Sequence, residues 1–425
     1  MLRVLRQRNF SLLWFGQFIS IIGDWVLFIA LPFYTYSLTG SVLATGAMFI
    51  VSTLPRLLLG SVAGVFVDRW DRKRTMIVAD LLRVVLVAML VLVRSRDFLW
   101  LIYVSSFLES VVSQFFNPAK SAIIPLLVGE KDLLAANSLN GTSDALTRLI
   151  GSALGGVMMG WLGFSSVVLL DAGSFLVSAL MIALILLPAR TDTRPDAARA
   201  PGGGILGVWR EWVAGLRLVK RERLLLMLFI VMGVAMLGDS MITVLIVPLV
   251  KTLMGGGAQL LGWLMMAQGI GGLLGGLLLA QFGKHLSPRR LSAIGLFVTG
   301  IIIFVIVKIP HSILVLPLMA VGGLAAATWF ISSETLLQLG TTDEFRGRIF
   351  GTLGTTSALA YLVGMLLASA LTDLLGLVLI LTISGGLYIF SGILAWIMLP
   401  KTQPSQPDRP AKVGHELSNE QYSVN

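Results

Sequence analysis

The stretch that decides the fold reads GVFVDRWDRKR and spans residues 64–74. It joins two apolar segments, residues 42–67 and 75–93, and about 20 apolar residues suffice to cross a bilayer as a helix. In lipid only helices and closed barrels satisfy their backbone hydrogen bonds, and these segments are too long and too continuously apolar for barrel strands. The stretch therefore predicts a short charged loop between two transmembrane helices.

The rest of the chain has the same character. Of 425 residues, 56% are hydrophobic and 13% charged, with a mean hydropathy of +0.89, whereas a soluble domain carries about 25% charged residues. We predict an all-α integral membrane protein with twelve transmembrane helices: residues 11–36, 42–67, 75–93, 98–116, 137–161, 165–187, 224–250, 259–282, 291–307, 312–337, 348–371 and 374–399.

Several kinds of chemistry are excluded by composition. The chain has no cysteine, which removes disulfides, thiolate metal sites and Cys nucleophiles. Its three histidines are scattered, and it has no G-x-x-x-x-G-K-[ST] phosphate loop, so we expect no ATP hydrolysis by that route, no metal site and no cofactor. The first apolar segment lacks a small-residue cleavage site and is expected to be retained.

The basic residues predict the orientation. With the N-terminus in the cytoplasm, 25 Lys and Arg fall in cytoplasmic segments and four outside, while three stay within helices. This bias places both termini in the cytoplasm by the positive-inside rule. It also accounts for the net charge of +10 without a nucleic-acid partner. The outer residues are Arg94, Arg96, Lys251 and Lys308, and those within helices are Arg56, Arg83 and Arg148.

One longer polar stretch divides the chain. We expect a six-helix bundle over residues 1–187, a cytoplasmic linker over 188–223, a second six-helix bundle over 224–400 and a disordered cytoplasmic tail over 401–425. Within the linker, residues 208–223 alternate apolar and basic side chains in the pattern of an amphipathic helix at the membrane interface.

The two halves resemble each other at an offset of about 215 residues. Gly23-Asp24 in the first helix corresponds to Gly238-Asp239 in the seventh, and Lys73-Arg74 corresponds to Arg289-Arg290. Parallel repeats of this kind place a binding site between the halves near the middle of the membrane.

The loop at residues 64–74 matches G-x-x-x-D-R-x-x-R-[KR], and here the chain resembles the major facilitator superfamily. The match comprises Gly64, Asp68, Arg69, Arg72 and Lys73, with Arg74 following. The resemblance implies two pseudo-symmetric six-helix bundles and transport by alternating access.

Further residues make the chain similar to the drug and siderophore exporter branch, with macrolide-efflux-like and enterobactin-exporter-like members. The residues that carry this similarity are Arg8-Asn9-Phe10, Leu13-Trp14, Gly23-Asp24, Asn117–Lys120, Ala135–Leu139, Gly215-Leu216-Arg217 and Phe345–Gly351. The run Gly151–Gly156 resembles the antiporter motif G-P-x-x-G-G, with Ser152 in place of Pro, and the Arg that many drug/proton antiporters carry in helix 4 is absent.

The resemblance implies proton-driven export of small hydrophobic or amphiphilic molecules, drug-, macrolide- or siderophore-like. We expect a monomer in the bacterial cytoplasmic membrane, with lipid, substrate and protons as its partners and the proton motive force as its energy source.

Charged residues inside membrane helices are the candidate site. Each is costly unless it has a partner, water or a proton, and burial disfavours the charged form of a carboxyl, so such an acid can exchange protons near neutral pH. We predict that Asp24, with Glu109 or Asp239, binds a proton or a cationic drug, and that Arg56 lies at the depth of Asp24. A permanent structural ion pair is the alternative. Asp171 is expected to be structural.

Gating and packing roles are predicted for other residues. Glu109 and Arg148 lie at similar depth on consecutive helices and are expected to pair, with Asp144 competing one turn away. The loop is expected to act as a cytoplasmic latch, in which Asp68 is held by Arg83 or by the start of the eleventh helix. Gly151, Gly155 and Gly156 are expected to let helices approach closely.

Other functions on the same scaffold stay open from the sequence. One is transport of lysophospholipid or another metabolite. A membrane-embedded enzyme would need a nucleophile/base pair or a metal cluster at mid-membrane, and the sequence offers neither. A sensor would need a recognisable soluble domain, for which the linker and tail are too short.

Overall fold

The computed structural model describes residues 2–67, 69–186, 205–283, 286–341 and 343–399. The first half contains α1 (Arg8–Thr39), α2 (Val42–Val67), α3 (Arg72–Ala88), α4 (Leu99–Val128) and α5 (Leu133–Ala183). Short helical turns precede α1 (η1, Leu2–Arg6), join α3 to α4 (η2, Met89–Leu92, and η3, Arg96–Phe98) and join α4 to α5 (η4, Glu130–Asp132). After α6 (Ile205–Arg221), the second half contains α7 (Arg223–Pro248), the π-helical turn η5 (Leu249–Leu253), α8 (Ala258–Phe282), α9 (Pro288–Lys308), α10 (Ser312–Leu339), α11 (Asp343–Leu375) and α12 (Leu377–Met398).

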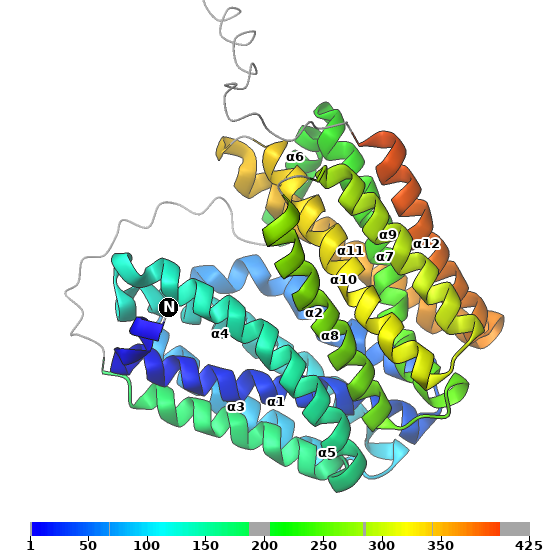
Figure 1. The fold of residues 1–425 in the computed structure, drawn as a ribbon. Coiled ribbons are helices and arrows are strands. Elements are labelled where there is room, and N and C mark those ends of the chain that lie inside the picture. Colours follow the sequence, from blue (N-terminus) through cyan, green and yellow to red (C-terminus); the bar gives the residue numbers. More distant parts are fainter. Residues whose placement is uncertain (1, 68, 187–204, 284–285, 342, 400–425) are drawn as a thin grey trace, which may run out of the picture.

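Twelve membrane-length helices result, because α5 is two helices in one. The described residues hold 11 helices long and apolar enough to cross a membrane, with α5 counted once. Inside α5, Gly163 has φ 76° and ψ 175°, which is not helical and is a conformation that glycine adopts readily. Figure 1 shows the chain reversing its direction there. The predicted twelve-helix membrane fold is therefore confirmed.

Helix ends differ from the prediction at the fourth and fifth helices. We expected the fourth to end at Phe116, but α4 continues through Pro118 and Pro125 to Val128. The fifth helix was expected to begin at residue 137, but α5 begins at Leu133. Hydropathy marks where lipid ends and not where a helix ends. The extension is held by Arg72, which donates from Nη1 to the carbonyl of Ala122 at 3.2 Å.

The linker helix α6 packs on the second half. Its Trp212 indole donates to Thr356 Oγ1 of α11 at 3.0 Å, Gly215 lies directly against Thr352 of α11, and Val219 is buried. The basic side chains on its other face, Arg210, Arg217, Lys220 and Arg221, are exposed. The rest of the predicted linker, residues 188–204, and the tail, residues 401–425, lie outside the described residues.

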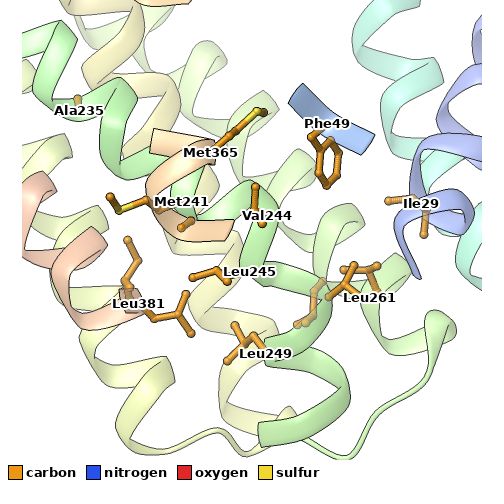
Figure 2. Packing of buried hydrophobic residues seen from close by; sticks show 14 of the residues in the cluster. Ile29, Phe49, Ala235, Met241, Val244, Leu245, Leu249, Leu261, Met365 and Leu381 are labelled. Atoms are coloured by element: carbon orange, nitrogen blue, oxygen red, sulfur yellow. The ribbon is translucent and has the colours of Figure 1, made fainter. Parts of the chain in front are cut away.

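The two halves diverge toward the side of the molecule that carries α6 and meet at the other side (Figure 1). At the meeting side α5 packs on α8 and α2 on α11. Lys251 Nζ, just after α7, donates to Ser37 Oγ of α1 at 2.8 Å. One apolar cluster runs across this junction, with Ile29 and Phe49 of the first half facing Leu261 and Val244 of the second (Figure 2).

Equivalent contacts in the two halves display the internal repeat. Lys73 donates to the carbonyls of Ala183 and Ile185, at 2.8 Å each, where the sixth transmembrane helix ends. Arg289, its counterpart, donates to the carbonyl of Trp396 near the end of α12. Cations that bind the terminal carbonyls of a helix also favour its dipole.

Candidate functional site

A cavity of about 320 Å³ lies inside the first half, and we call it the acidic cavity. Three carboxyl side chains line it, Asp24 from α1, Glu109 from α4 and Asp171 from α5, among apolar neighbours. Asp24 is exposed to the cavity, Glu109 is 31% exposed and Asp171 is only 1% exposed. The cavity thus brings Asp24 and Glu109, both predicted from the sequence, together with an acid that we expected to be structural.

Arg83 lies behind this cavity and holds a polar network. Its guanidinium lies 3.3 Å from Asp80 Oδ1 and 3.6 Å from Glu109 Oε1, and it donates to Ser113 Oγ at 2.7 Å. Asp80 is fully buried and also accepts from Ser178 Oγ at 2.7 Å. Asp80 was not among the predicted residues, although its spacing of three residues from Arg83 on one helix favours this pair.

The predicted pair between Glu109 and Arg148 is wrong, because Arg83 is the partner of Glu109. Arg148 instead stacks over the ring of Trp25, 5.4 Å from its centroid. Equal depth along two helices says nothing about the direction in which each side chain points, and α5 turns Arg148 toward the second half. Asp144, the expected competitor, is exposed on the same helix.

A second cavity of about 380 Å³, the central cavity, lies between the halves. The first half lines it with Trp25, Phe28, Ile29, Pro32, Phe49 and Arg148. Helices α7 to α12, with Leu249 of η5, supply the rest of its mainly apolar and aromatic wall. Its polar groups are few, which is the usual make-up of a small-molecule site. The side chains that carry them are Arg148, Asp239, Thr243, Gln268, Thr299, Tyr361 and Tyr388.

Asp239 is the carboxyl group of the central cavity, and two tyrosines surround it. Tyr388 Oη donates to Asp239 Oδ1 at 2.8 Å. Tyr361 Oη lies 2.7 Å from Thr243 Oγ1, and Thr243 sits one turn from Asp239. Asp239 was predicted from the sequence, but the two tyrosines were not, because an aromatic residue within an apolar helix is typical of a buried core position.

The other predicted residues lie away from both cavities or outside the described residues. Arg56 is exposed and lines neither cavity. Asp68, the predicted latch, lies outside the described residues. Arg69 is exposed, and Arg74 donates its backbone N–H to Asp71 Oδ1, which caps α3. Gly64 belongs to the last turn of α2.

The glycine run of α5 lies at two helix crossings. Side chains at Gly151 and Gly155 would collide with the backbone of α1, at Ile22 and Val26. Gly156 faces Gly262 of α8 across the junction of the two halves.

Two bundles around a central cavity define a transporter of the major facilitator type, and comparison with known proteins agrees. The family model of transmembrane secretion effectors matches residues 2–420, and the chain belongs to this major facilitator family. The family and its relatives are transporters and not enzymes.

Three curated relatives cover most of the chain. The uncharacterized MFS-type transporter YfiS of Bacillus subtilis is 28% identical over 92% of this chain and 93% of its own length. Macrolide efflux protein A of Streptococcus pyogenes is 25% identical, with 87% and 90% covered. The multidrug efflux pump Tap of Mycolicibacterium fortuitum is 28% identical, with 84% and 87% covered.

Solved structures share the fold. A crystal structure of a mutant of the nucleoside transporter NupG has a TM-score of 0.74 at 10% identity, covering 92% of this chain and all of its own. A bacterial homologue of the iron transporter ferroportin, in its inward-facing state, has a TM-score of 0.71 at 15% identity, with 93% and 98% covered. At these identities the likeness concerns the fold alone.

Proposed function

We propose that this transporter exports small hydrophobic or amphiphilic molecules, macrolide- or other drug-like or siderophore-like, in exchange for protons. The observation that carries the proposal is the central cavity, which both halves line with apolar and aromatic side chains around one carboxylate and one guanidinium. An apolar and aromatic wall of this kind accepts varied apolar substrates, and a small number of polar groups is enough to orient them. The names of two relatives, a macrolide efflux protein and a multidrug efflux pump, support export.

In this proposal the two cavities have different roles. Substrate occupies the central cavity, where Asp239 faces a basic group of the substrate and Arg148 an acidic or carbonyl group. Protons occupy the acidic cavity, with Asp24 and Glu109 as their acceptors. Arg56 has no part, since it lines neither cavity.

Alternating access follows from the junction of the halves. The described conformation is open on the α6 side, which we assign to the cytoplasm of a bacterial cell, with both termini on that side. In the other state the contacts of Lys251 with Ser37 and of Gly156 with Gly262 must separate. The described part of the charged loop contacts only the first half here, as a latch released in this state would.

The test is transport in proteoliposomes under an imposed pH gradient, with erythromycin as the first probe. We expect uphill movement that a protonophore abolishes and that Asp24→Asn loses. Asp97→Asn, at an exposed position of the short helical turn η3, is the matched control. Full pH-driven transport by Asp24→Asn would remove Asp24 from coupling. Movement of lysophospholipid or another metabolite, but of no drug in a panel, would replace the substrate class.

A further inference from the structure

Asp171 is the most deeply buried acid of the acidic cavity, and its carboxyl group is poorly satisfied. Its Oδ2 is buried and has no hydrogen-bond partner. Its Oδ1 lies 3.3 Å from Ser174 Oγ, but that hydroxyl donates to the Asp171 main-chain carbonyl at the shorter distance of 2.7 Å. A hydroxyl has one proton to give. The carboxyl of Asp171 therefore has no donor of its own.

Helix α1 closes the other side of this group. A Cβ at Gly23 would overlap both Asp171 Oδ1 and Ser174 Oγ, so the α1 backbone rests directly on the carboxyl. Glycine at position 23 makes this approach possible. Because Asp24 follows at once and faces the same cavity, the Gly-Asp pair brings the two acids together.

Two acids and one arginine from other helices surround Asp171. Asp24 from α1 and Glu109 from α4 act on it as like charges, and Arg83 from α3 is the cation that acts on it. Arg83, however, is already bound to Asp80, Glu109 and Ser113. Lys120 of α4 is a further cation nearby, and its charge acts on Asp24 and on Asp80.

We propose that Asp171 carries a proton in this conformation and is a further exchangeable proton site of the transporter, beside Asp24 and Glu109. A protonated carboxyl removes the unpaired charge and leaves one oxygen as a hydrogen-bond donor. A metal ion fits less well, because no group of three His, Asp or Glu side chains in the described ranges converges enough to hold one. This inference rests on the proposed proton antiport.

The exchange step is simple. Asp171 loses its proton to water in the acidic cavity, directly or through the carboxylate of Asp24, which is exposed there. Asp171 is left as a carboxylate until it takes up a proton again. Three acids in one cavity would allow more than one proton to move in each cycle.

Infrared difference spectroscopy of the whole protein in liposomes, labelled with ¹³C-aspartate, tests the proposal without any substrate. The wild type should show an isotope-shifted C=O band of a protonated aspartate that disappears as the pH is raised. Asp171→Asn should lose this band, whereas Asp24→Asn and Ser174→Ala should keep it. If Asp171→Asn does not fold, Asp171→Ser is the second variant.

Three results would overturn the proposal. The first is an unchanged band in the Asp171 variant. The second is a band that the variant loses but that does not change with pH in the wild type, because such a band would come from a permanent structural proton. The third needs no variant, namely a wild-type spectrum without any protonated aspartate. Because the spectra report protonation and not transport, a failure of proton antiport in proteoliposomes remains a separate outcome.

Discussion

Phe28 of α1 and Phe49 of α2 pack edge to face, with ring centroids 6.1 Å apart and planes at 61°, and both rings line both cavities. Together with Pro32, which also lines both, they form a thin apolar partition between the acidic cavity and the central cavity. In the proposed mechanism this partition separates protons from substrate.

Removing part of the partition should let protons through without substrate. We expect Phe28→Ala to join the two cavities, because the ring that divides them is lost, and to dissipate an imposed pH gradient faster in liposomes free of drug. Phe28 is 43% exposed, so the change should cost less stability than the about 3–5 kcal/mol of a buried Phe→Ala. A pH-sensitive dye inside the liposomes gives the rate.

Phe98→Ala is the matched control, since Phe98 is 45% exposed and lies in a short turn away from the cavities. An equal leak in both variants would show that a damaged fold, and not the partition, sets the rate.

Neutralising the carboxylate of the central cavity should separate cationic from uncharged substrates. We expect Asp239→Asn to weaken binding of tetraphenylphosphonium by about tenfold to a hundredfold, because two opposite charges about 6–10 Å apart at an effective dielectric constant of about 20 attract by about 1.7–2.8 kcal/mol. Binding of uncharged chloramphenicol should change little. Quenching of tryptophan fluorescence measures both, since Trp25 lines the cavity.

Asp373→Asn, an exposed acid near the end of α11, should leave both affinities unchanged. An equal loss for the two probes in Asp239→Asn would mean that Asp239 shapes the cavity and does not bind the cation.

The sequence predicted which helices carry the buried charges, but not the direction in which each charged side chain points. Asp24 lies in α1 and Glu109 in α4, and the two share a cavity. Which helix face each charge occupies depends on packing, so Arg148 was paired with the wrong residue and Arg83 was overlooked as the partner of Glu109. The direction of a side chain depends on how its helix is rotated about its own axis, and glycines that pack against a neighbouring helix help to set this rotation. Counting residues from the ends of an apolar segment does not give the rotation.

The tyrosines of the central cavity were not predicted as site residues, for a related reason. Tyr361 and Tyr388 lie on α11 and α12, more than 100 residues from Asp239 along the chain. No local pattern links them to the acid, and only the assembled second half brings Tyr388 within 2.8 Å of it.

The buried network of Arg83 should be essential to stability. Arg83→Ala leaves the fully buried Asp80 without its cation, and breaking one side of a buried pair costs about 3–5 kcal/mol. We expect a large drop in the temperature at which the detergent-solubilised protein loses its monodisperse peak in size-exclusion chromatography.

The double variant Arg83→Ala with Asp80→Asn should recover part of that loss, because it removes the stranded charge as well. If the loss of stability in the double variant equals the sum of the losses in Arg83→Ala and Asp80→Asn, the pair has no coupling energy. Arg83 would then act only through its packing on Phe116 and Phe175.

The contact of Gly156 with Gly262 should control which side of the transporter is open. A Cβ at Gly156 would lie 2.6 Å from the carbonyl oxygen of Ala258 and 2.8 Å from Gly262 Cα, so Gly156→Leu cannot fit while the halves meet there. We expect this variant to open the side opposite α6. Gly160→Leu is the control, because its nearest contact would be an ordinary 3.7 Å to Gln259.

Distances between paired spin labels measure the outcome, and the natural chain suits them because it has no cysteine. Labels at Arg94→Cys and Lys308→Cys, both exposed on the side opposite α6, should move apart in Gly156→Leu. Labels at Lys131→Cys and Gln338→Cys, exposed on the α6 side, should move closer. If both distances match those of the Gly160→Leu control, this glycine contact does not hold the halves together, and the closed side must depend on other contacts such as that of Lys251 with Ser37.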